Sequence, residues 1–205
     1  MILAVCLLLE LLAGMEVDLF VPSLPLIQNC FNITPFIAEL TFALNLIGYC
    51  FASFLASPIA NRLGKKKAVL LGCVVFIIGS LFCSFSPTFT LILCGRFLQG
   101  IGIALPCVLA YVILTDHYTE EQQVRFMGYM NATVTFGMAI APVIGSFVAN
   151  KFGWCGNFHT LTIFGFLVFF LVLFLLPNDK PNNITQRSLI AYKTVLKNTL
   201  NWQMM

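Results

Sequence analysis

The chain has 205 residues, of which 60% are hydrophobic and only 9% are charged, and its mean hydropathy is +0.94. Soluble domains carry about 25% charged residues, so this composition excludes an ordinary soluble protein and indicates a polytopic membrane protein. The net charge of +3 is too small to indicate a nucleic-acid partner. The eight cysteines contain no C-x-x-C pair and the two histidines lie far apart, so neither a disulfide framework nor a metal site is expected.

Six apolar segments are long enough to cross a membrane. About 20 helical residues, each rising 1.5 Å, cover the roughly 30 Å of hydrocarbon in a bilayer. We therefore expect an all-α membrane protein with a six-helix bundle over residues 1–176. In chain order, the expected spans are about Ile2–Val21, Phe36–Ala60, Ala68–Phe85, Phe89–Thr115, Phe126–Ala149 and Phe158–Leu176.

Basic residues gather on one predicted side of the membrane. Nine of the eleven lysines and arginines lie between the second and third segments, between the fourth and fifth, or after the sixth. Cytoplasmic loops of membrane proteins carry an excess of lysine and arginine, so both termini are predicted to be cytoplasmic. Residues 177–205 then form a cytoplasmic linker, with a short amphipathic helix expected over Ser188–Leu200.

Arg96 lies in the fourth apolar segment, which contains no other charge. A charged side chain at membrane depth costs roughly 2.5–3.5 kcal/mol, so it is kept where it is paired or faces a wet cavity. The acids at a similar depth all lie on the first segment: Glu10, Glu16 and Asp18. Depth and helical angle favour Asp18 or Glu10 as the partner, and they place Glu16 at a helix contact or near the outer interface.

Two interpretations of these charges stay open. In the first, Glu10, Asp18 and Arg96 couple proton binding to substrate binding, because burial and neighbouring charges control how readily a carboxylate takes up a proton. In the second, Asp18 and Arg96 are a structural ion pair that locks two helices together. Glu10 has no evident basic partner, which favours the functional interpretation for that residue. The candidates to line a substrate cavity are Phe20, Asn45, Tyr49 and Tyr111.

The loop after the second segment contains Asn61, Arg62, Gly64, Lys65 and Lys66. This pattern resembles the cytoplasmic loop motif of the major facilitator superfamily, in which an aspartate stands at the position of Asn61. The resemblance implies a charged latch between two halves of a transporter, which Asn61 cannot complete because it carries no charge. A plain positively charged turn is the alternative interpretation.

Two further motifs resemble signatures of the same superfamily. The segment Gly95–Gly102 is similar to its fourth-helix signature R-F-x-Q-G-x-G, in which the resemblance associates Arg96 with proton coupling. The alternative is a glycine-rich packing face with one structural arginine. On the fifth segment, the antiporter signature G-x-x-x-G-P-x-x-G-G is partly matched by Gly137, Ala141, Pro142 and Gly145. The small residues among them, with Ala149, form a ridge that lets helices approach closely.

Other segments resemble the Bcr/CflA-type (MdfA-like) multidrug–proton antiporters of this superfamily. Asp18–Pro25 is similar to the end of their first helix, Phe152–Phe158 is similar to the entry of their sixth, and Glu10 precedes Asp18 by eight residues as in MdfA-like members. The resemblance implies proton-coupled export of lipophilic small molecules across a bacterial inner membrane. It also implies a proton gradient as the energy source, with no cofactor.

The resemblance covers one of two six-helix halves, between which such transporters bind substrate. The expected partners are therefore the lipid bilayer, a small lipophilic substrate and a second half, supplied by the same gene, a separate chain or a homodimer. The ridge on the fifth segment is expected to face that second half, or lipid in its absence. The alternative hypothesis is a truncated or split half with no transport of its own. No nucleophile–base arrangement supports an enzyme, and no nucleic acid is expected as a partner.

Overall fold

The computed structural model describes residues 1–178, so the helix expected over Ser188–Leu200 lies outside the described part of the chain. Within residues 1–178 every regular element is a helix, which confirms the all-α class. The elements are α1 (Ile2–Asp18), the 3-10 helix η1 (Val21–Ser23), α2 (Leu24–Phe31), α3 (Pro35–Leu63), α4 (Lys65–Ser84), α5 (Phe89–His117), α6 (Glu120–Phe152) and α7 (Trp154–Leu175).

Five helices in the described part of the chain, α3 to α7, are long and apolar enough to cross a membrane. Helix α1 is shorter, with 17 residues, or about 25 Å at 1.5 Å per residue. The chain then bends through η1 into α2, which the sequence analysis did not expect. Pro22 and Pro25 lack backbone N–H groups and so interrupt a continuous helix. Asn157 of α7 holds the bend, because its Nδ2 donates to the Leu19 carbonyl at 2.9 Å and to Ser23 Oγ at 2.7 Å.

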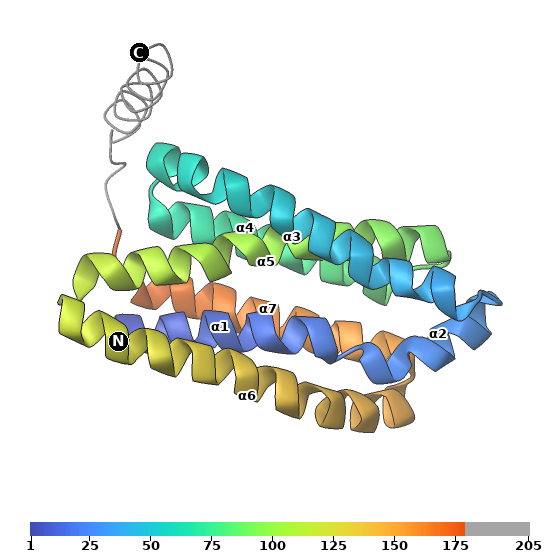
Figure 1. Cartoon of the computed structure of the whole chain (residues 1–205). Helices are drawn as coiled ribbons and strands as arrows, with labels where there is room; N and C mark the ends of the chain where they lie inside the picture. Colours follow the sequence, from blue (N-terminus) through green and yellow to red (C-terminus); the bar gives the residue numbers. More distant parts are fainter. Residues whose placement is uncertain (179–205) are drawn as a thin grey trace, which may run out of the picture.

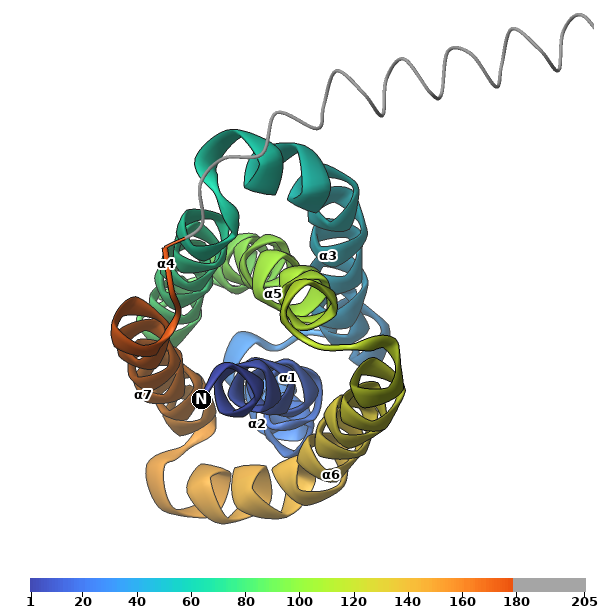
Figure 2. The same ribbon diagram turned by 90° about the vertical axis from the view of Figure 1, so that its left-hand side faces the viewer.

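The helices form two groups of three that pack together. Helices α3, α4 and α5 lie on one side of the bundle, and α1, α6 and α7 lie on the other (Figure 1). Figure 2 shows α1 surrounded by α5, α6 and α7, so the helix that carries Glu10 and Glu16 lies inside the bundle. A charged side chain on α1 therefore faces another helix or a space between helices.

Gly64 alone connects α3 to α4, where the sequence analysis expected a loop over residues 61–67. Its φ is +89°, a value that side chains with a Cβ rarely adopt, and its N–H donates to the Ala60 carbonyl at 2.8 Å. Glycine at this place in the motif is therefore a requirement of a one-residue turn between two long helices.

The small-residue ridge of α6 packs against α1 inside this half, which overturns the expectation that it faces a second half or lipid. Gly137, Ala141, Gly145 and Ala149 are all buried. A Cβ added to Gly145 would collide with the Leu19 carbonyl group. The bulky residues of α6 point outward instead, among them Phe136, Val143 and Phe147. The ridge lies inward because α1 has small residues of its own, and the two backbones can approach only along small-residue faces.

Candidate functional site

A buried ion pair joins α5 to α1. Arg96 Nη1 lies 2.6 Å from Glu16 Oε1, and the two side chains are 0% and 1% exposed. Further hydrogen bonds hold both partners: Asn45 Nδ2 donates to the same Glu16 oxygen at 2.8 Å, and Arg96 Nη1 donates to Gln99 Oε1 at 2.7 Å. Gln99 Nε2 in turn donates to Ser80 Oγ at 2.7 Å. Side chains from α1, α3, α4 and α5 thus form one polar network in an apolar bundle.

Aromatic packing completes the surroundings of Arg96. Its guanidinium carbon lies 4.2 Å from the centre of the Phe20 ring, a cation–π contact. Phe20 packs in turn on Phe42 and Phe158, at centroid distances of 4.8 and 5.9 Å. Phe20 is therefore fully buried and lines neither of the two cavities described below, contrary to the sequence prediction. The bend after α1 turns its ring inward, onto the guanidinium.

Arg96 pairs with neither Asp18 nor Glu10, the partners that depth and helical angle predict, but with Glu16. Asp18 is half-buried at the end of α1, and within the described residues it forms neither a hydrogen bond nor an ion pair. Glu10 lies six residues before Glu16, about 9 Å farther along the helix. The physical reason is rotational: α5 packs on the face of α1 that carries Glu16, and Asp18 is turned about 200° away from it. That rotation depends on which faces of α1 the other helices cover.

Glu10 lies at the edge of an inner cavity of about 360 Å³ between α1, α3, α5 and α6. Cys107 Sγ lies 3.5 Å from Glu10 Oε2, and the Tyr49 hydroxyl donates to Cys107 Sγ at 3.3 Å. The second carboxylate oxygen of Glu10 is buried and has no hydrogen-bond partner within the described residues. The polar residues that line this cavity are Glu10, Glu16, Asn45, Tyr49, Cys107, Tyr111 and Asn131. Of the residues predicted to line a substrate cavity, Asn45, Tyr49 and Tyr111 therefore lie here.

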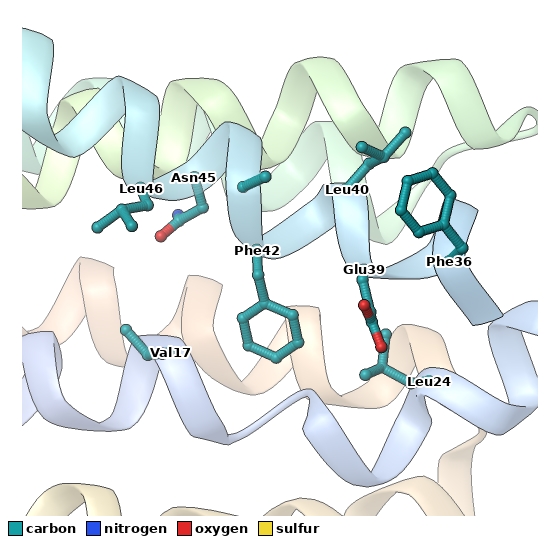
Figure 3. Close-up of a pocket in the computed structure, with 9 residues that line it drawn as sticks. Val17, Leu24, Phe36, Glu39, Leu40, Phe42, Asn45 and Leu46 are labelled. Atoms are coloured by element: carbon teal, nitrogen blue, oxygen red, sulfur yellow. The ribbon is translucent and has the colours of Figure 1, made fainter.

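An outer cavity of about 670 Å³ lies between α1, α2 and α3, toward the end of the bundle that holds α2 (Figure 3). Val17, Asn45 and Leu46 line both cavities, so the two spaces adjoin. Glu39 of α3 also lines the outer cavity. It is not among the site residues predicted from the sequence. The signal was present, because Glu39 is the only charged residue between Pro35 and Ala60, just as Arg96 is the only one in its segment.

The motif at the α3–α4 turn forms an ion pair with the far end of α5. Lys65, the first residue of α4, pairs with Asp116 in the last turn of α5. Arg62 is exposed, and Asn61 and Lys66 are half-buried. The motif therefore holds three helices of this half together. Among residues 1–178, no three His, Cys, Asp or Glu side chains lie close enough to hold a metal ion.

A membrane bundle that encloses paired charges and adjoining cavities is the architecture of a solute-transporter domain. Residues 6–205 match the family model described as the Major Facilitator Superfamily. The chain therefore belongs to the major facilitator superfamily, whose members are transporters and not enzymes.

Curated relatives carry a multidrug name. The multidrug resistance protein MdtL of Shigella dysenteriae serotype 1 (strain Sd197) is 34% identical over 173 residues, which are 84% of this chain and 44% of that protein. MdtL of Escherichia coli O157:H7 matches with the same identity and coverage. The chain thus spans 44% of the length of these relatives.

Solved structures of sugar transporters share the fold. A D-xylose–proton symporter superimposes with a TM-score of 0.79 and 17% identity, over 99% of this chain and 52% of the other. The xylose transporter XylE from E. coli, in a partially occluded inward-open conformation, gives a TM-score of 0.77 and 17% identity, over 86% and 49%. At this identity the likeness concerns the fold alone, and it confirms the expected half of a major facilitator fold.

Proposed function

We propose that this chain is the first half of a proton-coupled exporter of lipophilic small molecules, cationic ones included. The main support is Glu10, a buried acid at the edge of a cavity. Among residues 1–178 it has no basic partner, and one of its carboxylate oxygens accepts no hydrogen bond. A proton or a cationic group of a substrate can occupy that oxygen, and the two exclude each other. The multidrug names of the relatives support lipophilic substrates.

The buried ion pair serves as the fixed point of this mechanism. Glu16 and Arg96 neutralise each other and are held by Asn45 and Gln99, so this carboxylate is already committed to a partner. Glu10 then binds the proton, and Asp18 at the outer end of α1 is the proposed second proton-coupling acid. A proton that enters from outside neutralises Glu10 and weakens its binding of a cationic substrate, so the substrate is released. Arg96 acts on the site through Glu16, by fixing α1 against α5.

The proposed exporter is of the Bcr/CflA type. It lies in a bacterial inner membrane with both termini cytoplasmic. The end of the bundle at the α3–α4 turn carries four of the basic residues, Arg62 and Lys65 to Lys67. The N-terminus lies at the same end (Figure 1), and Met1 lines a hollow there together with Leu176. A second six-helix half closes the inner cavity, which α3 and α6 border on this chain. No cofactor takes part, and the proton gradient supplies the energy.

Ethidium efflux driven by a proton gradient tests the proposal. The vesicles contain this chain, either alone or with a second six-helix half. They are everted, so their cytoplasmic face is outside, and efflux is measured as ethidium transport into the lumen. We expect Glu10→Gln to reduce efflux to the level of vesicles without the chain, because glutamine cannot release a proton. Glu121→Gln is the matched control, since it removes an exposed acid at the start of α6. Normal efflux by Glu10→Gln would rule out the role given to Glu10. Efflux only with the second half would show that this chain is a non-transporting half by itself.

A further inference from the structure

The outer cavity has the composition of a binding site for a bulky apolar ligand. At about 670 Å³ it is within the usual size of small-molecule sites. Its lining is apolar except for Glu39 and Asn45, and the apolar residues are Val17, Leu24, Phe36, Leu40, Phe42, Ala43 and Leu46. Most of the surface offered to a ligand is therefore hydrocarbon, with two aromatic rings among it.

Glu39 gives this apolar space one negative charge. It lies four residues beyond the start of α3, about 6 Å along the helix. Figure 3 shows its carboxylate directed across the cavity toward Leu24 of α2. Within residues 1–178 the ion pairs are Lys65–Asp116 and Arg96–Glu16, so Glu39 has no basic partner in the described part of the chain. Glu39 is exposed on the open side of this cavity, as are Phe36 and Leu40. An accessible carboxylate beside hydrocarbon attracts a positively charged ligand, and the rings of Phe36 and Phe42 add cation–π attraction.

The outer cavity also adjoins the proposed transport site. Val17, Asn45 and Leu46 separate it from the inner cavity. Asn45 is fixed, because its Nδ2 donates both to Glu16 Oε1 and, at 3.1 Å, to the Arg96 carbonyl. The apolar side chains of Val17 and Leu46 have no such bonds. A ligand that leaves Glu10 toward the outer end can therefore displace these two side chains and reach Glu39.

We infer that the outer cavity is a second binding site for lipophilic cations, in which Glu39 is the counter-charge. The inference rests on the proposed function, because it deepens the path taken by the exported substrate. The site receives the cation once Glu10 takes up a proton, and it shortens the step from a buried acid to the outer solution. A basic side chain of the second half that pairs permanently with Glu39 is the competing explanation for this charge.

Thiol protection by tetraphenylphosphonium, a lipophilic cation, tests the inference on the full chain in detergent. Cys107 reports on the inner cavity, and the thiol introduced by Leu40→Cys reports on the outer one. N-ethylmaleimide modification of each thiol is measured by peptide mass spectrometry. We expect tetraphenylphosphonium to slow modification of both. Adding Glu39→Gln should raise the tetraphenylphosphonium concentration needed to protect the outer thiol about tenfold. The concentration needed to protect Cys107 should stay unchanged. Glu39→Asp keeps the charge and should keep the protection.

The possible results separate the two proposals. If protection of the outer thiol is the same with Glu39→Gln, or is lost at both thiols together, Glu39 is not the counter-charge of a separate site. If the cation protects Cys107 alone, the outer site does not exist while the proposed function stands. If it protects neither thiol, both proposals fail. Tetraphenylphosphonium could protect the outer thiol fully in the chain alone but not when a second half is bound. In that case Glu39 is a pairing residue between the halves, and the inference is overturned.

Discussion

At the scale of single residues, hydrogen bonding distinguishes the two inward acids of α1, which are both buried. Glu16 Oε1 accepts from two strong donors, Arg96 Nη1 at 2.6 Å and Asn45 Nδ2 at 2.8 Å. Among residues 1–178, Glu10 has only the weak Cys107 thiol as a donor, at 3.5 Å on one oxygen. A carboxylate with strong fixed donors is held in place, whereas one with only a weak donor keeps an oxygen open to a proton or a ligand. In the proposed mechanism, the same helix supplies one anchoring acid, Glu16, and one proton-exchanging acid, Glu10.

The anchoring role of the ion pair leads to a stability prediction. Removing one member of a buried pair leaves an uncompensated charge and costs roughly 3–5 kcal/mol. We expect Arg96→Leu and Glu16→Leu each to lower the thermal unfolding temperature of the chain in detergent. The double variant should lose less than the sum of the two, because it leaves neither charge alone. Arg62→Leu, at an exposed arginine, should change the unfolding temperature little. Strict additivity of the two single effects would contradict the pairing.

The identity of the partner of Arg96 could not be predicted from sequence, although its burial could. A single charge in an apolar segment was sufficient to predict a paired or cavity-facing arginine. The choice among Glu10, Glu16 and Asp18 depends on how α1 is rotated, which is set by contacts such as that of Gly145 with the Leu19 carbonyl. Glu39 could have been found by the argument used for Arg96. The inward turn of Phe20 could not, because it follows from the bend after α1.

At the scale of elements, the small residues of α6 determine how it packs. A periodicity of four identified a close-packing face, but it does not specify which helix packs there. That face is occupied by α1, and the backbone of α6 comes so near Leu19 that Gly145 has no room for a side chain. The ridge therefore positions α1, and with it Glu10 and Glu16, relative to α5. The extra helix α2 was missed for a related reason: eight residues containing a proline give little periodic signal.

Glycine substitutions on α6 test this packing. Gly145→Ala should lower the unfolding temperature clearly, because the added methyl group forces α6 away from the α1 backbone. Gly128→Ala is the matched control on the same helix, since nothing lies within 4 Å of a Cβ there. Alanine is favoured over glycine in a helix interior by about 1 kcal/mol, so the control should be neutral or slightly stabilised. Equal effects of the two substitutions would contradict close packing at Gly145.

At the scale of the whole molecule, the distribution of charge is the basis of the proposed orientation. The end of the bundle with the α3–α4 turn carries the basic cluster, and the opposite end carries α2 and, among the basic residues of the described chain, Lys151. This asymmetry was visible in the sequence because it depends only on counting charges between apolar segments. The class of fold was predictable from the apolar segments themselves. A long apolar segment that crosses a membrane forms a helix, because a helix satisfies its own backbone hydrogen bonds.

The proposed orientation predicts a labelling pattern. Cys30 is exposed in α2 at the proposed outer end, so a membrane-impermeant maleimide should modify it in intact cells. A thiol introduced by Lys67→Cys at the start of α4 should be modified only after the membrane is permeabilised. Peptide mass spectrometry distinguishes these sites from the other cysteines. The reverse pattern would show that the termini face outward.

The single-residue turn at Gly64 restricts how this region can change its length. One residue added to the start of α4 would rotate the rest of the helix by about 100° relative to α3. Gly72 and Gly79, which meet the backbone of α5 closely, would then turn away from it, and bulkier residues would collide there. Lys65 would also leave Asp116. Insertions and deletions at this junction should therefore be absent among functional members, while substitutions at the neighbouring exposed positions are tolerated.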